Sequence, residues 1–236
     1  MVVVLPTERS VPNRALDMKS ILLFGHPKIG KSTFANRAKK AVFFECEPGL
    51  NELSVFRIPI RCWPDFLEAC KLIAEGNHDF RTIVIDTADI AFRLCTEYVN
   101  AKHGVEYEGD LPHGKGWAFV KAEWTRVLTR LAGLPYGLIL ISHATEKETE
   151  SRTGTYMRTV PSLPERARQV VLGLTDLILF CDTVSVREKD GSVTTQRVIR
   201  TKPHPAWEAG DRTGRLPETM PLDYDAFEKA FTSDAL

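Results

Sequence analysis

Residues 25–32 read Gly25-His26-Pro27-Lys28-Ile29-Gly30-Lys31-Ser32, and Thr33 follows them. The two glycines let the backbone curl so that successive N–H groups point inward at phosphate oxygens. Lys31 supplies a positive charge to the β and γ phosphates, and the Ser32 hydroxyl is a ligand for Mg²⁺. The stretch lies between a short apolar run and a helical segment, so residues 25–33 predict a binding loop for ATP and Mg²⁺. The alternative is a glycine-rich turn closed by a solvated lysine.

The chain has 236 residues, of which 43% are hydrophobic and 26% are charged, as is typical of one globular domain. Its 31 basic and 31 acidic residues cancel, so net charge gives no overall attraction to nucleic acid or to a membrane. An anionic partner would have to meet a local basic patch.

The five cysteines form no Cys-x-x-Cys pair, which favours reduced thiols over a disulfide framework or a zinc site. The N-terminal apolar run is short and lacks a basic start, and no stretch approaches the roughly 20 apolar residues of a membrane span. We therefore expect a soluble cytoplasmic protein without a membrane partner.

Short apolar runs alternate with helical patterns along most of the chain. The runs predict buried strands, and their order predicts an α/β fold with a mostly parallel sheet and helices on both faces. The expected strands are 20–24, 41–45, 82–86, 137–142 and 177–181. The expected helices are 31–40, 64–74, 90–102 and 117–131.

The C-terminal part changes pattern. Residues 184–187 and 193–201 flank Asp190-Gly191, a dipeptide suited to a tight turn, so they predict a β-hairpin that extends the sheet. We expect three parts in the chain: an N-terminal arm (1–18), a nucleotide-binding domain (19–222), and a short helix with a tail (223–236).

A second nucleotide motif ends in Asp86. The run Thr82-Ile83-Val84-Ile85-Asp86 places a carboxylate at the C-terminal end of a buried strand, where it could reach Mg²⁺. The alternative is an aspartate that only forms a turn or caps a helix. The next residue is Thr87 and not glutamate, so the general base must come from another strand.

Two strand ends offer candidates for that role. The strand 41–45 runs into Glu45-Cys46-Glu47, and either glutamate could orient the attacking water, unless both are solvated turn residues. The strand 137–142 is followed by His143, which could sense the γ-phosphate or be an ordinary surface histidine.

These residues together resemble the RecA-like P-loop ATPase core, and especially the compact phage proteins described as ATP-dependent single-strand-annealing recombinases. The resemblance spans about residues 19–220. It implies that Glu47 is the catalytic glutamate, that Lys31 takes part in catalysis, and that His143 couples the nucleotide state to a following DNA-binding loop. A phage-encoded chain would act in the cytoplasm of its bacterial host.

By the same resemblance, residues 144–168 form that DNA-binding loop. The segment has cations and one aromatic side chain that could contact phosphates and stack on a base: Lys147, Arg152, Arg158, Arg166, Arg168 and Tyr156. Its glutamates partly cancel this charge, so a solvated surface loop is the alternative. Residues 102–117 occupy the place of the family's other DNA loop, where we expect Trp117 to anchor the following helix in the core rather than to stack on DNA.

The resemblance also makes Arg200 and Lys202 basic fingers that enter the ATP site of a neighbouring subunit. It therefore implies a homo-oligomer with ATP at the subunit interfaces, to which residues 2–5 could add a strand. The alternative for Arg200 and Lys202 is a pair of cations that protect an edge strand.

The residues and the resemblance together leave three function classes, of which the first is what the resemblance implies. The leading hypothesis is an ATPase, stimulated by DNA, that binds single-stranded DNA and promotes annealing or recombination, with a single-strand-binding protein as a possible partner. The second is a non-hydrolysing, nucleotide-dependent adaptor for a replication or recombination protein. The third is a small-molecule P-loop kinase whose arginine-rich lid would be residues 144–168.

Overall fold

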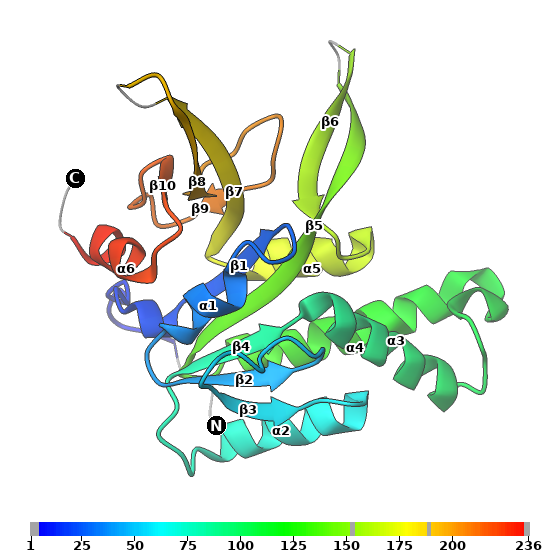
Figure 1. Cartoon of the computed structure of the whole chain (residues 1–236). Helices are drawn as coiled ribbons and strands as arrows, with labels where there is room; N and C mark the ends of the chain where they lie inside the picture. Colours follow the sequence, from blue (N-terminus) through cyan, green and yellow to red (C-terminus); the bar gives the residue numbers. More distant parts are fainter. Residues whose placement is uncertain (1–4, 152–153, 188–189, 234–236) are drawn as a thin grey trace.

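A mostly parallel sheet forms the centre of the protein, whose computed structural model describes residues 5–151, 154–187 and 190–233 (Figure 1). Six strands lie side by side and parallel: β7 (Leu177–Arg187), β1 (Ser20–Gly25), β5 (Gly137–Ser151), β4 (Thr82–Asp86), β2 (Ala41–Glu45) and β3 (Phe56–Pro59). Antiparallel strands extend it beyond β7: β8 (Val193–Arg200), β10 (Thr219–Pro221) and β9 (Gly210–Asp211).

Helices cover both faces of this sheet. One face carries α2 (Trp63–Glu75), α3 (Ala88–Lys102), α4 (Lys115–Ala132) and α5 (Glu165–Leu174), and the other carries α1 (Lys31–Asn36) and α6 (Tyr224–Thr232). Three short 3₁₀ turns complete the elements: Leu16–Met18, Glu108–Asp110 and Pro112–Gly114. The expected α/β fold with helices on both faces is therefore confirmed.

The alternation of side chains along β1 shows why its sequence is a continuous apolar run. Leu22 and Phe24 pack with the α2–α5 side, whereas Ile21 and Leu23 pack with the α1 and α6 side. Successive side chains of a strand point to opposite faces, so a strand covered on both faces needs apolar residues at every position. The buried strand fixes the point at which residues 25–32 leave the sheet.

Two expected strands, β2 and β4, begin and end at the expected residues. The helix expected at 31–40 is wrong in its length, because it ends at Asn36 and a turn follows in which Lys40 has a φ of 45°. β3 and α5 were not expected: β3 is a short, largely exposed edge strand, and α5 begins after Pro164 within the segment that the sequence suggested was a loop.

Residues 144–168 are not an irregular loop, which corrects the expectation from the sequence. β5 continues past Ser142 and pairs antiparallel with β6 (Gly154–Pro161), and α5 follows. We call residues 144–161 the first ribbon. Arg152, a cation expected to contact DNA, lies outside the described residues.

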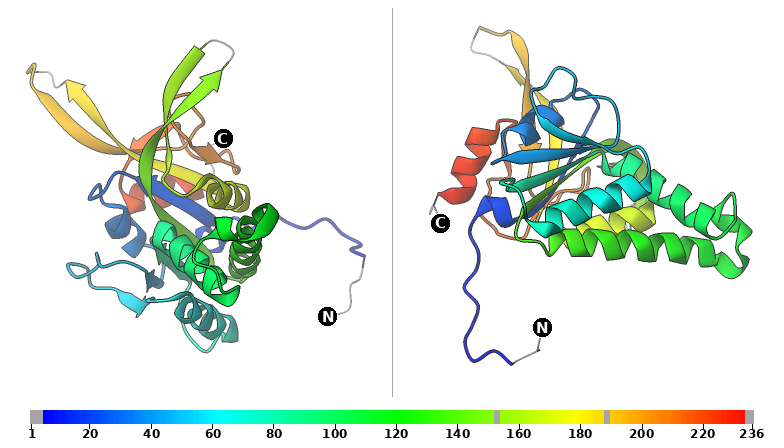
Figure 2. Two further views of the ribbon diagram at one scale, coloured as in Figure 1. Left: turned by 90° about the vertical axis from the view of Figure 1, so that its right-hand side faces the viewer. Right: turned by 90° about the horizontal axis from the view of Figure 1, so that it is seen from below.

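The expected C-terminal β-hairpin is confirmed as β7 paired with β8. We call residues 182–198 the second ribbon. Figure 1 shows both ribbons rising from the same edge of the sheet, and Figure 2 shows them diverging from neighbouring points on the body. The two ribbons are therefore the parts of the chain that project farthest beyond the strand ends on this side.

The N-terminal arm from residue 5 to residue 15 has no helix or strand and stretches away from the body (Figure 2). Its apolar side chains Leu5 and Val11 are exposed. Residues 2–4, which were expected to add a strand to a neighbour, lie outside the described residues. Across the described part of the chain, every helix is too short or too polar to cross a lipid bilayer.

Candidate active site

The loop of residues 25–32 joins the end of β1 to the start of α1, as the sequence predicted. Gly30 has a φ of 112°, a left-handed conformation that suits glycine and turns the chain into the helix. An ideal Cβ at position 25 would lie 2.6 Å from the carbonyl oxygen of Cys181 on β7. Glycine is therefore required at position 25 by the neighbouring strand as well as by the loop.

Lys31 lies inside this loop and is almost fully buried. Its Nζ donates to the carbonyl oxygens of Gly25, at 2.9 Å, and His26, at 3.0 Å. Burial lowers the pKa of the Lys31 ammonium, although nearby acidic groups act in the opposite direction. The side chain places a positive charge at the centre of the loop, where a phosphate would lie.

Ser32 and Asp86 meet at the sheet edge. The Ser32 Oγ donates to Asp86 Oδ2 at 2.7 Å. Burial raises the pKa of Asp86, the hydrogen bond from Ser32 lowers it, and the charge of Glu47 raises it again. A buried carboxylate beside a hydroxyl is a donor set of the kind that Mg²⁺ prefers, so the residues present fit this ion.

The protein supplies only part of a magnesium shell. Among the described residues, no group of three or more histidine, cysteine, aspartate or glutamate side chains could hold a metal. Mg²⁺ commonly keeps waters and binds through one or two protein ligands together with phosphates. The Ser32 and Asp86 pair matches that pattern.

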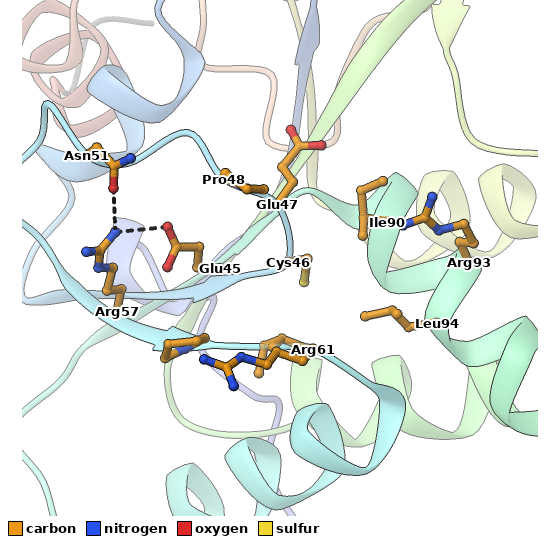
Figure 3. Close-up of a pocket in the computed structure, with 12 residues that line it drawn as sticks. Glu45, Cys46, Glu47, Pro48, Asn51, Arg57, Arg61, Ile90, Arg93 and Leu94 are labelled. Atoms are coloured by element: carbon orange, nitrogen blue, oxygen red, sulfur yellow. Dashed lines mark hydrogen bonds and ion pairs between the residues drawn. The ribbon is translucent and has the colours of Figure 1, made fainter.

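The structure separates the two glutamates that the sequence left as alternatives. Arg57 Nη1 donates to Glu45 Oε1 at 3.0 Å, and the side chain of Glu45 is mostly buried. Glu47 instead lies 3.3 Å from His143, measured from Oε1 to Nε2. Figure 3 shows Glu45 turned toward Arg57 and Glu47 pointing away from it. The carboxylate of Glu45 is therefore paired with Arg57, whereas that of Glu47 contacts His143 at the edge of the sheet.

His143 lies directly beside the phosphate loop, because β1 and β5 are parallel and pair Gly25 with His143. Its backbone N–H donates to Asp89 Oδ2 at 3.2 Å, and its buried Nδ1 has no hydrogen-bond partner among the described residues. Three neighbouring strands, β5, β4 and β2, therefore bring His143, Asp86 and Glu47 to one edge. The parallel order of the strands predicts this meeting from the sequence.

Arg200 and Lys202, which were expected to reach the ATP site of a neighbouring subunit, make contacts within their own chain. Arg200 Nε lies 3.3 Å from Asp182 Oδ2, and its guanidinium stacks over the ring of Trp207. Lys202 Nζ lies 3.1 Å from Asp211 Oδ2. In this arrangement the charge of each side chain is paired at the base of the second ribbon.

Sequence reasoning missed a third cation, which lies on β8 with Arg200. Arg197 lies three residues before Arg200, and its Nη1 donates to the carbonyl oxygen of Ile29 in the phosphate loop at 3.2 Å. The same nitrogen lies 3.0 Å from the position of a Cβ at Gly30. The signal was present as three cations within residues 197–202, but the resemblance assigned a role only to the later two.

The cations of the proposed DNA segment are also largely paired. Lys147 lies 2.7 Å from Glu165, and Arg158 lies 3.3 Å from Glu208. Tyr156 lies on the first ribbon beside Met157, which is exposed. The first ribbon therefore has little unpaired positive charge among its described residues.

Residues 102–117 connect α3 and α4 through two 3₁₀ turns instead of an open loop. The expected core role of Trp117 is wrong, since 38% of the residue is exposed and Arg166 lies over its ring, 5.0 Å from the centroid. Trp124, two turns later on α4, is fully buried and is the anchor of this helix. The junction between α4 and α5 thus presents an aromatic ring and a guanidinium at the surface.

Comparisons with known proteins identify a family and similar proteins. Residues 17–213 match the family described as AAA domain. A curated relative, the SPbeta prophage-derived uncharacterized protein YorG of Bacillus subtilis (strain 168), is 28% identical over 185 residues, or 76% of this chain. The match covers 55% of that relative, so the chain spans about half the length of the curated relative that it matches. A solved KaiC-like protein from Pyrococcus horikoshii OT3 has a TM-score of 0.43 and 14% identity, with 78% of each chain covered.

Proposed function

Because the chain belongs to the AAA domain family, with a match over residues 17–213, we propose that it hydrolyses ATP and uses this reaction to bind single-stranded DNA. The activity that this serves is the annealing or recombination of DNA strands. The observation that carries the proposal is the contact of Glu47 with His143 at the sheet edge where Ser32 meets Asp86.

In this proposal residues 25–33 bind the phosphates. Backbone N–H groups of the curled loop donate to phosphate oxygens, and Lys31 leaves the carbonyl groups that it now contacts to pair with the β and γ phosphates. Ser32 and Asp86 would hold Mg²⁺, which neutralises charge on the phosphates when it is bound. Adjacent β- and γ-phosphates are thus held with the γ-phosphate toward Glu47 and His143.

Glu47 orients and deprotonates the attacking water as general base, because its carboxylate contacts His143 at the sheet edge whereas that of Glu45 is paired with Arg57. Glu45 cannot take over this role while Arg57 occupies its carboxylate. His143 contacts Glu47 from β5, which is separated from β2 by β4, and hydrogen-bonds to the γ-phosphate or to the water. The presence of nucleotide thereby changes what His143 contacts at the base of the first ribbon.

The proposed DNA site combines the first ribbon with the α4–α5 junction. The support is positional: the ribbon starts at His143, and the exposed Trp117 with Arg166 offers a ring and a cation at the neighbouring surface. Backbone phosphates would compete with Glu165 for Lys147. A homo-oligomer with ATP at its interfaces would require Arg200 and Lys202 to exchange their own-chain carboxylates for a neighbour's phosphates. A single-strand-binding protein is the proposed partner on DNA.

The test is the rate of ATP hydrolysis with and without single-stranded DNA, measured over a range of salt concentrations. We expect ADP and inorganic phosphate as products and a faster rate with DNA, with stimulation that declines as salt rises. The Lys31→Ala variant is the control for contaminating ATPases. An equal rate with and without DNA at every salt concentration contradicts the coupling, and a phosphorylated small-molecule acceptor would indicate a kinase.

The internal pairing of Arg200 and Lys202 favours a second candidate, an adaptor that binds ATP without turnover. Such a protein would not need fingers that reach a neighbour. The adaptor predicts ATP binding with no phosphate release above the level of Lys31→Ala, with or without DNA. Phosphate release that disappears in Glu47→Gln while ATP binding remains excludes it.

A further inference from the structure

Asp89 connects three donors at the base of the first ribbon. It lies in the first turn of α3, three residues after Asp86. Its Oδ2 accepts from the backbone N–H of His143 at 3.2 Å, and its Oδ1 accepts from the Ser142 hydroxyl at 3.2 Å. The Ser162 hydroxyl makes a short hydrogen bond to the same Oδ1.

These donors come from both ends of the ribbon. Ser142 and His143 lie on β5 where it leaves the sheet, and Ser162 follows the last residue of β6. The backbone N–H of Ser162 also donates to the carbonyl oxygen of His143 at 2.9 Å. Figure 1 shows β5 passing from the sheet into the ribbon as one continuous strand. One carboxylate on α3 therefore ties the outgoing and returning strands together.

The position of Asp89 connects this tie to the nucleotide site. Asp86, three residues earlier at the end of β4, contacts Ser32 of the phosphate loop. His143, whose backbone N–H donates to Asp89, contacts Glu47 through its ring. Ionised acceptors make stronger hydrogen bonds than neutral ones, so Asp89 fixes the backbone of His143 firmly. Asp89 therefore contacts the base of the ribbon and is close in sequence to Asp86, which contacts the phosphate loop.

We propose that Asp89 is a positioning residue that holds His143 against Glu47 and transmits the nucleotide state to the first ribbon. The inference rests on the proposed function, because it assumes that ATP binds at residues 25–33. Nucleotide binding restricts the ribbon through Asp89, and by thermodynamic linkage a ligand that orders the ribbon strengthens nucleotide binding. An acidic residue in the first turn that only stabilised α3 would have no such effect on the ribbon.

The test is hydrogen exchange of peptides that cover residues 144–161, with and without a slowly hydrolysed ATP analogue. The variants are Asp89→Asn and Ser162→Ala. Asp79→Asn is the matched control, because the Asp79 side chain is 95% exposed and precedes β4, at the strand ends opposite those from which the ribbon extends. Affinity for a fluorescent ATP analogue is measured separately, as are kcat, KM and thermal unfolding. DNA is absent, so the result does not depend on the DNA part of the proposed function.

We expect the analogue to slow exchange in the ribbon of the wild type and of Asp79→Asn, but not in Asp89→Asn. In Asp89→Asn we also expect kcat to fall about tenfold with KM nearly unchanged, because the amide offers one neutral acceptor oxygen to three donors and holds His143 less firmly. Ser162→Ala leaves His143 and Glu47 untouched, so kcat stays near the wild-type value while the exchange response weakens. Asp89→Glu, which keeps the charge, restores part of the response.

Several outcomes overturn the inference. If the ATP analogue still slows exchange in the ribbon of Asp89→Asn, Asp89 does not transmit the nucleotide state to the ribbon. A wild type that binds the analogue without any change in ribbon exchange refutes the coupling and leaves the proposed ATP site intact. A fall in kcat that only follows a lower melting temperature, with a normal response in Ser162→Ala, assigns Asp89 a structural role alone. A wild type that binds no nucleotide refutes the proposed function, and the inference with it.

Discussion

The two ribbons leave the sheet from the strands on either side of β1, but they contact different parts of the candidate site. The first ribbon continues β5 and is held at its base by Asp89, beside the contact of His143 with Glu47. The second ribbon continues β7, and its Arg197 contacts the backbone of the phosphate loop at Ile29. The first ribbon is thus connected to the groups proposed to act on the γ-phosphate, and the second to the loop proposed to bind the phosphates.

If this difference is correct, removing the carboxylate of Glu47 should affect hydrolysis far more than nucleotide binding. We expect Glu47→Gln to lower kcat by about 100-fold or more, which is the usual contribution of a general base, while ATP affinity changes little. Glu45→Gln is the matched control, since Arg57 already occupies Glu45, and its kcat should stay within about threefold of the wild type. Equal losses in the two variants would break the distinction between the glutamates.

The β1–β7 side should be sensitive to the size of residue 25. A Cβ there would lie 2.6 Å from the carbonyl oxygen of Cys181, so Gly25→Ala forces the strands apart. We expect a loss of about 1–3 kcal/mol in the free energy of unfolding, measured by chemical denaturation. Gly173→Ala is the control, because it lies in α5 with open space around its Cβ and should be neutral or stabilising. Wild-type stability in Gly25→Ala would contradict the close approach of these strands.

Substitution of Arg197 tests whether the second ribbon affects ATP affinity independently of the first ribbon. Its hydrogen bond to Ile29 is a neutral-acceptor contact, whose loss costs about 1 kcal/mol, or roughly fivefold in affinity if the contact orders the loop for ATP. We expect Arg197→Ala to weaken ATP binding by that amount, measured by titration calorimetry, with no change in ribbon exchange at residues 144–161. Arg187→Ala, at the far part of the same ribbon, should bind ATP normally. Loss of the first-ribbon response in Arg197→Ala would show that the two connections are not separate.

The smallest expected effect is the pH dependence that Asp86 imposes. Burial raises the pKa of this carboxyl above its ordinary value of 3.8, so the stability linked to its protonated form is present at low pH and is lost as pH rises through the raised pKa. Mg²⁺ with nucleotide should offset that loss by binding the ionised form. We therefore expect the stabilisation by Mg²⁺ and ATP to decrease as the pH is lowered and to be lost while the pH is still above 3.8. The measurement is the shift in melting temperature on adding Mg²⁺ and ATP. In Asp86→Asn this shift should be small at all pH values.

Sequence patterns predicted the buried half of the molecule better than the projecting half. β2 and β4 were bounded correctly because short apolar runs between polar residues have clear ends, and the convergence of Glu47 with His143 follows from parallel strands that end at one edge. The first ribbon was taken for a loop because residues 144–151 have no apolar face, so the usual signal of a strand is missing.

Contacts of single side chains in the candidate site were also not predictable from the sequence. Asp89 has the sequence signature of an acidic residue in a first helical turn, and only the return of β6 to the sheet brings Ser162 to it. Arg57 likewise comes from a strand, β3, that its composition did not predict, so the choice between Glu45 and Glu47 could not be made before the pairing of these strands was known. Contacts between distant segments decided both cases.

The length of β5 sets how far a small rotation at the base of the first ribbon would move its end. The strand runs on from His143 to Ser151, which at about 3.4 Å per residue is a length of about 27 Å. A tilt of roughly 5° at His143 would carry the end of the strand through about 2 Å, a displacement comparable to the difference between a hydrogen bond and no contact. A rearrangement too small to disturb the packed sheet would therefore be amplified at the surface.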